Sequence, residues 1–239
     1  MKNQYFGDVH DFRKYGLLRH LSRSGFGRIA VAWMLTPDDG GTDGGLREYL
    51  QNEGRFAAFD PELFRSLREL VRRGASSVEL FERAGLLPSS SYYSEVVPDA
   101  AEQRREWMRG LLRHVEGADL VFVDPDNGIE IPTTPIGRKR SSKFVAWQEL
   151  DALWKSGCSL LIYQHFRREK RRTLAARRAA ELRERIGAEL IEAFRTPQVL
   201  FLLAAQARHA NAFAAARTLS SRAWKGHVDV MGLSAAQDE

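Results

Sequence analysis

Three short apolar runs, each followed at once by polar residues, constrain the fold of this 239-residue chain most strongly. They are IAVAWML at 29–35, DLVFV at 119–123 and SLLIY at 159–163. Runs of this length with β-branched residues are typical of strands that helices cover on both faces of a parallel sheet. Segments with helical spacing precede, separate or follow these runs, at 8–21, 46–71, 98–116, 147–155 and 167–185. We therefore predict an α/β fold with a doubly wound, mostly parallel sheet and helices on both faces, forming a single domain over 1–239.

The remaining segments predict fewer elements. Two further strands are expected at 197–205 and 227–231, on either side of a helix at 207–219. Asp60 and Pro61 predict an N-cap and the first turn of a helix inside the 46–71 segment. The polar stretch 89–93 is expected to be a loop that exposes the rings of Tyr92 and Tyr93.

Cysteine content and hydropathy exclude several classes of protein. The chain has one cysteine, Cys158, so it can form neither an internal disulfide nor a zinc site of several cysteines. No apolar run approaches the ~18 residues of a membrane span, and no apolar leader follows Met1. We expect a soluble, cytoplasmic protein with no membrane partner.

Polar residues gather where the three apolar runs end. Asp38 and Asp43 follow the first run, and His165 follows the third. The middle run opens into Asp124-Pro125-Asp126-Asn127-Gly128-Ile129-Glu130. Because the carboxyl ends of parallel strands meet at one edge of a sheet, we expect these side chains to converge on one cleft. Pro125 and Gly128 are expected to fix the turn that directs the Asp126 and Asn127 side chains.

The run VFVDP at 121–125 resembles the fourth motif of Rossmann-fold S-adenosylmethionine-dependent methyltransferases, in which a strand delivers Asp-Pro-Pro-Tyr or Asn-Pro-Pro-Tyr. DVHDFRKY at 8–15 resembles the N-terminal helix with a lysine found in bacterial large-subunit rRNA adenine-N6 methyltransferases. IYQHF at 162–166 is similar to their strand after motif four, and 33–45 occupies the position of their donor-binding glycine loop. The chain differs from the family in lacking the donor-loop glycine pattern and the second proline of motif four.

This resemblance implies methyl transfer to an exocyclic amine of a nucleic-acid base. It implies that Asp124 accepts a hydrogen bond from the amine and that the catalytic group comprises the following residues: Lys14, Asp124, Asp126, Asn127 and His165. It also implies S-adenosylmethionine as the cofactor, bound by Trp33, Asp38, Asp43 and Gly44.

The same acids allow a second interpretation. Carboxylate oxygens are the ligands that Mg²⁺ and Mn²⁺ prefer, and a bound ion can activate water. On this interpretation a metal is held by Asp38, Asp124, Asp126 and Glu130, and the protein is a nuclease or phosphohydrolase. A third interpretation is a relative that binds nucleic acid without catalysis.

Basic residues follow two of the predicted strand ends. One set is Arg138, Lys139, Arg140 and Lys143, and the other is Arg167, Arg168, Lys170 and Arg171. If they face the cleft, they would neutralise phosphates and give salt-dependent binding to nucleic acid. The alternative for the second set is a solvated helix face on which arginines pair with Glu169, Glu181 and Glu184.

Overall fold

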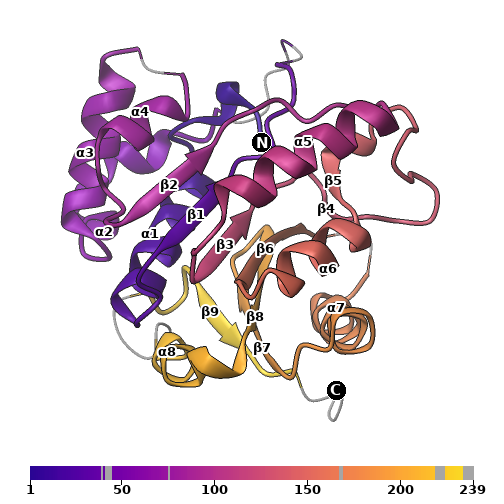
Figure 1. Cartoon of the computed structure of the whole chain (residues 1–239). Coiled ribbons are helices and arrows are strands. Elements are labelled where there is room, and N and C mark those ends of the chain that lie inside the picture. Colours follow the sequence, from indigo (N-terminus) through magenta and orange to yellow (C-terminus); the bar gives the residue numbers. More distant parts are fainter. Residues whose placement is uncertain (39, 41–44, 75, 167–168, 219–223, 234–239) are drawn as a thin grey trace.

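A seven-stranded sheet runs through the centre of the molecule (Figure 1). The computed structural model describes residues 1–38, 40, 45–74, 76–166, 169–218 and 224–233. The strand order is β2-β1-β3-β6-β8-β7-β9. The strands are β1 (Ile29–Ala32), β2 (Ser90–Tyr93), β3 (Leu120–Val123), β6 (Ser159–His165), β7 (Leu190–Arg195), β8 (Val199–Ala205) and β9 (Asp229–Met231).

The sheet is mostly parallel. Strands β2, β1, β3 and β6 pair in parallel, whereas β8 is antiparallel to both β6 and β7, and β9 is antiparallel to β7. Only β8 and β9 of these seven strands are therefore reversed. Two short strands, β4 (Gly128–Ile129) and β5 (Phe144–Val145), form a separate parallel pair. The α/β class and the mostly parallel sheet predicted from the apolar runs are confirmed.

Helices cover both faces of the sheet. They are α1 (Val9–Arg23), α2 (Glu53–Phe56), α3 (Pro61–Arg72), α4 (Glu79–Arg83), α5 (Ala101–His114), α6 (Trp147–Lys155), α7 (Arg171–Ile186) and α8 (Ala210–Ala216). Four short 3₁₀ turns complete the described elements: η1 (Asn3–Tyr5), η2 (Glu48–Gln51), η3 (Ser141–Lys143) and η4 (Ala207–His209). No helix in the described ranges is long and apolar enough to cross a membrane.

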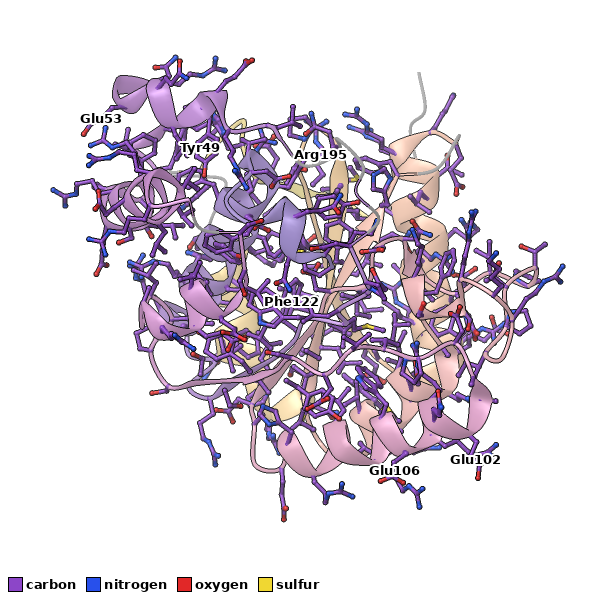
Figure 2. The ribbon with its side chains drawn as sticks, turned by 90° about the horizontal axis from the view of Figure 1, so that it is seen from above. Tyr49, Glu53, Glu102, Glu106, Phe122 and Arg195 are labelled. Carbon is purple, nitrogen blue, oxygen red and sulfur yellow. The ribbon has the colours of Figure 1, made fainter. Side chains whose placement is uncertain are left out.

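Alternate residues of each strand build two separate cores. In β3, Phe122 packs with α1, α3, α4 and α8, while Val121 and Val123 pack with α5, α6 and α7. Figure 2 shows Phe122 near the middle of the molecule and Glu102 and Glu106 of α5 at its periphery. Because both faces of β1 and β3 are covered, every residue of these two strands is buried.

Helix α1 precedes the first strand and carries the N-terminal part of the chain to the sheet edge. It begins at an N-cap, Asp8, whose side chain accepts hydrogen bonds from the backbone N–H groups of His10 and Asp11. Its residues from Asp11 to Arg19 are all buried. Lys14 in this helix binds Asp124, so the N-terminal part of α1 lies where β3 ends.

Segment 89–93 is not the exposed loop expected from its polar residues. It contains β2, an edge strand paired in parallel with β1. The ring of Tyr92 stacks on Trp33 with centroids 6.0 Å apart, and the Tyr93 hydroxyl donates to the Trp107 carbonyl at 3.0 Å. Both rings are half-buried, because each polar tip has a partner while the ring body packs.

Two other expectations were wrong in detail. Strand β7 was missed because its sequence LIEAFR carries charges, yet Glu192 is buried and bonded to Arg217 at 2.7 Å. Segment 46–71 is not one helix; it divides into η2, α2 and α3. The last of these begins where predicted, since Asp60 caps it by accepting from the Leu63 N–H.

Candidate functional site

A cavity of about 490 Å³ lies beside the carboxyl ends of β3 and β6 and the first turns of α1. The chain passes from β1 to β2 on one side and later to β3 on the other, so the strand order reverses between β1 and β3. Crevices at such a reversal are where open α/β sheets bind ligands. The cavity is lined by residues of the N-terminal segment, α1, the loop after β3, Lys143, Tyr163, His165 and Val199.

Lys14 is a buried cation held between two carboxylates. Its Nζ donates to Asp11 Oδ1 at 3.0 Å and to Asp124 Oδ2 at 2.7 Å. Burial opposes the positive charge, but the attraction of Asp11 and Asp124 outweighs it and raises the pKa of Lys14 above its ordinary value. Lys14 therefore stays charged and fixes the position of Asp124.

Asp124 follows the last residue of β3, and its backbone N–H donates to the Ala32 carbonyl at the end of β1. Burial raises the pKa of its carboxyl group, while Lys14 acts in the opposite direction. Among the described residues the Asp124 carboxylate accepts from Lys14 alone, through Oδ2. Because Asp124 lines the cavity, Oδ1 is the oxygen left for a ligand.

Asp126 is occupied by groups of the protein itself. Its Oδ1 lies 2.7 Å from the ammonium group of Met1, and its Oδ2 accepts from the Thr36 hydroxyl at 2.9 Å. Burial opposes ionisation, but these partners together hold the pKa of Asp126 below its ordinary value. Met1 also donates to the carbonyls of Met34 and Asp124, so it lies between the ends of β1 and β3.

Gly128 and Gln164 hold the loop after Asp126 in place. Gly128 has a φ of 108°, and a Cβ there would lie 2.5 Å from the Gln164 side chain, so only glycine fits. Gln164 accepts from the Ile129 N–H at 3.1 Å and donates to the Asn127 carbonyl at 3.1 Å. Gln164 is thus a positioning residue, and the exposed Asn127 lines the cavity.

Asp8 and His10 were not identified from the sequence, although both line the cavity. Burial, with the nearby charge of Asp11, raises the pKa of Asp8 to about 7. Burial, with Arg13 and Lys14, lowers the pKa of His10 to about 4. Near neutral pH the carboxyl group of Asp8 is thus partly protonated, whereas the imidazole of His10 is neutral.

The spacing Asp8-x-x-Asp11-x-x-Lys14 could have revealed Asp8, although not His10. Positions three apart lie on neighbouring turns of one helix face, so this pattern places two acids and a base together. Asp11 is also bonded to the Tyr15 hydroxyl at 3.1 Å and to the Gly7 N–H at 2.9 Å.

The structure brings together five of the residues expected to be catalytic, which all line the cavity: Lys14, Asp124, Asp126, Asn127 and His165. Lys143, expected to bind nucleic acid, lines it too, with Nζ 3.8 Å from Asp126 Oδ2. His165 is exposed at the end of β6, and its Nδ1 lies 3.0 Å from the Phe166 carbonyl oxygen.

Other expected site residues lie elsewhere. Trp33 is fully buried in the core, where its Nε1 donates to Glu82 at 2.8 Å, and it does not line the cavity. Asp38 is exposed and accepts from the Gln4 N–H, whereas Glu130 accepts from the Trp147 N–H at the start of α6. Four residues fall outside the described ranges: Asp43, Gly44, Arg167 and Arg168.

The proposed metal ligands are consequently not gathered in one place. Within the described ranges no group of three or more His, Cys, Asp or Glu side chains is arranged to hold a metal ion. Between Asp11 and Asp124 the cation is the Lys14 ammonium. The hydrolytic interpretation stays a prediction that no observed cluster favours.

The basic residues separate into different surroundings. Arg138, Lys139 and Arg140 lie on an exposed loop whose backbone is held by Asp99, and none of them lines the cavity. Lys170 and Arg171 are exposed at the start of α7, and the Arg171 guanidinium lies 4.9 Å from the Phe166 ring centroid. Further along α7, Arg177 pairs with Glu169 and Glu181.

Comparison with known proteins adds nothing to this geometry. No family model, curated protein or solved structure matches the chain.

Proposed function

We propose that this protein is an S-adenosylmethionine-dependent methyltransferase that acts on an exocyclic amine of a nucleic-acid base. One observation carries the proposal. Lys14 and Asp124, taken from two sequence segments that separately resemble such enzymes, are 110 positions apart and are joined at 2.7 Å beside the cavity. Two segments that are distant in the sequence therefore meet at one point.

The position of the cavity supports the proposal. It lies where the strand order reverses, and its volume of about 490 Å³ suits a small molecule. Its walls include four carboxylates, those of Asp8, Asp11, Asp124 and Asp126.

The residues present also fit the cofactor. S-adenosylmethionine supplies a methyl group on a positively charged sulfur and also carries an ammonium group. Carboxylates attract both charges, and the four carboxylates of the cavity outnumber the two cations paired with them, Lys14 and the Met1 ammonium. The rings of Tyr5 and Tyr163 also line the cavity, where the Nζ atoms of Lys2 and Lys14 lie 5.6 and 5.8 Å from their centroids. We assign the binding of the donor's charged groups to Asp8 and Asp11.

The role of Asp124 follows from its two oxygens. Lys14 binds Oδ2 and keeps the Asp124 side chain in one orientation. Oδ1 is then left to accept a hydrogen bond from the substrate amine. This hydrogen bond would turn the nitrogen lone pair away from Asp124 and into the cavity. Transfer would form an N–CH₃ bond as the donor's S–CH₃ bond breaks, with S-adenosylhomocysteine as the leaving group and the amine proton passing to Asp124 Oδ1. Beyond this the protein supplies positioning.

The test compares two aspartates at opposite ends of β3. Asp124→Asn is expected to lower the methylation rate of an adenine-containing RNA roughly 100-fold, because the charge that orients the amine is lost. Asp119→Asn is the matched control, since Asp119 precedes β3 at the far end of the strand and bonds Arg28 and His209 there. Methylation is measured with a radiolabelled donor.

Donor binding is measured separately by calorimetry with S-adenosylmethionine and S-adenosylhomocysteine. The wild type and both variants are expected to bind the donor. If the wild type shows no donor binding and no methylation, the proposal is wrong. If Mg²⁺ or Mn²⁺ instead stimulates RNA cleavage that Asp124→Asn abolishes, the hydrolytic interpretation replaces it.

A further inference from the structure

We propose that Asn127, Lys143 and His165 form a phosphate-binding rim at the cavity, which holds the phosphate of the nucleotide whose base faces Asp124. This inference rests on the proposed function and specifies its substrate as a phosphorylated nucleotide unit. The three residues come from three different segments of the chain, and all of them line the cavity.

Backbone hydrogen bonds place the three residues side by side. The Asn127 N–H donates to the Lys143 carbonyl at 2.9 Å, and the His165 N–H donates to the Asn127 carbonyl at 3.3 Å. Asn127 and Lys143 directly precede β4 and β5, which are paired in parallel, and His165 ends β6. The rim therefore belongs to a hydrogen-bonded framework and not to three independent loops.

The side chains of the rim suit a phosphate. They carry an amide, an ammonium and an imidazole, and each of these groups can donate hydrogen bonds to phosphate oxygens. Lys143 is 32% exposed at its side chain, and its 3.8 Å separation from Asp126 is too long for a hydrogen bond. Asn127 and His165 are exposed. All three groups are thus accessible to a ligand.

The floor of the cavity does not cancel this preference, although it holds four carboxylates. Lys14 lies between Asp11 and Asp124 and offsets one of their two charges, the Met1 ammonium is paired with Asp126, and Lys2 adds a further cation to the lining. Asp8 has a pKa raised to about 7 by burial and by Asp11, so it carries only part of a charge near neutral pH. Positive charge that is weakly compensated thus remains at Lys143.

Positive charge also continues beyond His165. Lys170 and Arg171 lie exposed at the start of α7, where Arg171 covers one face of Phe166. A nucleic-acid strand with one phosphate on the rim could extend its neighbouring phosphates towards these residues. The loop at Arg138–Arg140 does not line the cavity and is given no part in this contact.

The experiment measures binding of AMP, adenosine and inorganic phosphate by calorimetry. Wild-type protein is expected to bind AMP about tenfold more tightly than adenosine, the contribution of one charge-assisted hydrogen bond. Lys143→Met should remove most of this preference and leave adenosine binding unchanged. Lys155→Met is the matched control, because Lys155 is exposed on α6 and pairs with Asp151. Thermal unfolding of each variant establishes that it is folded.

The outcomes separate the rim from the methyltransferase proposal. Equal affinity for AMP and adenosine in a wild type that binds S-adenosylmethionine overturns the rim alone. Phosphate bound as tightly as AMP overturns the nucleotide assignment. A preference for AMP that depends on Lys143, in a protein that does not bind S-adenosylmethionine, supports the rim and contradicts the proposed function.

Discussion

Helix α1 carries two buried cations five positions apart, Lys14 and Arg19, and their surroundings differ. Arg19 joins α1 to α3: its Nε donates to Asp60 at 2.7 Å, and its other nitrogens bond Glu62 and the Leu86 carbonyl. Lys14 joins α1 to the end of β3 through Asp124, beside a cavity. Both side chains are only 4% exposed, so burial does not distinguish them.

The two arrangements differ in how many hydrogen bonds the carboxylate bound to the cation already accepts. Asp60 binds Arg19 through both oxygens and also caps α3 through the Leu63 N–H, so its bonding capacity is spent on the fold. Asp124 makes its one side-chain hydrogen bond to the described residues through Oδ2, and it lines the cavity. A buried charge therefore indicates a functional site only where part of its bonding capacity remains and a ligand can reach it.

The largest expected effect comes from removing each cation. Lys14→Met and Arg19→Met should each lower the free energy of unfolding by about 3–5 kcal/mol, because each leaves carboxylates buried without their partner. Only Lys14→Met should abolish methyl transfer, as it frees Asp124. Urea unfolding and donor assays below the unfolding temperature measure both properties.

Lys14→Arg provides the control for this pair, because it retains the charge and should recover part of the stability. The comparison fails if folded Arg19→Met loses methyl transfer as completely as folded Lys14→Met. In that case the two cations would be equivalent, and the cavity would not be what distinguishes Lys14.

A smaller effect concerns Asp8, the N-cap at the cavity end of α1. Its native pKa of about 7 exceeds the ordinary 3.8, so between these values the native state binds more protons than the unfolded state. The contribution of Asp8 to stability is therefore complete below pH 3.8 and is lost as pH rises towards 7, by up to about 1.4 kcal/mol per pH unit.

Asp8→Asn should remove this pH dependence of the free energy of unfolding. It should still cap α1, because asparagine caps helices as well as aspartate does. His10, with its pKa lowered to about 4, produces a slope of the opposite sign below 6.5. The quantity to measure is thus the difference between variant and wild type in urea unfolding across this range. An unchanged slope in Asp8→Asn would contradict the assignment.

The smallest effect is expected on the exposed side of the molecule. Arg177 of α7 pairs with Glu169 at 2.6 Å and Glu181 at 3.0 Å, but its side chain is 41% exposed. Arg177→Ala should change the free energy of unfolding by less than about 1 kcal/mol, since water screens such pairs. If Arg177→Ala lowered the free energy of unfolding as much as Arg19→Met, the number of ion pairs, and not their burial, would determine the loss.

Much of the fold could be predicted because local patterns determine it. The apolar runs at β1, β3 and β6 can be buried only between helical layers, and Asp60 with Pro61 marks the start of α3. Strand β7 could not be recognised, since Glu192 is charged and is buried with the help of an ion pair to Arg217, a residue from the segment after α8. Edge strand β2 was obscured in the same way, because its tyrosines find their partners on other elements.

The sequence by itself determined the α/β class and the edge of the sheet at which Asp124, Asp126, Asn127 and His165 would emerge, because chain direction and strand ends are local properties. Only the tertiary structure decided that Lys14 binds Asp124, that Trp33 belongs to the core, and that Lys143 lies at the cavity while Arg138 does not. Those outcomes depend on which elements pack together. The ion pair between Lys14 and Asp124 joins residues 110 positions apart, so no local sequence pattern indicates it. It forms because α1 packs against the sheet in which β3 leads into Asp124.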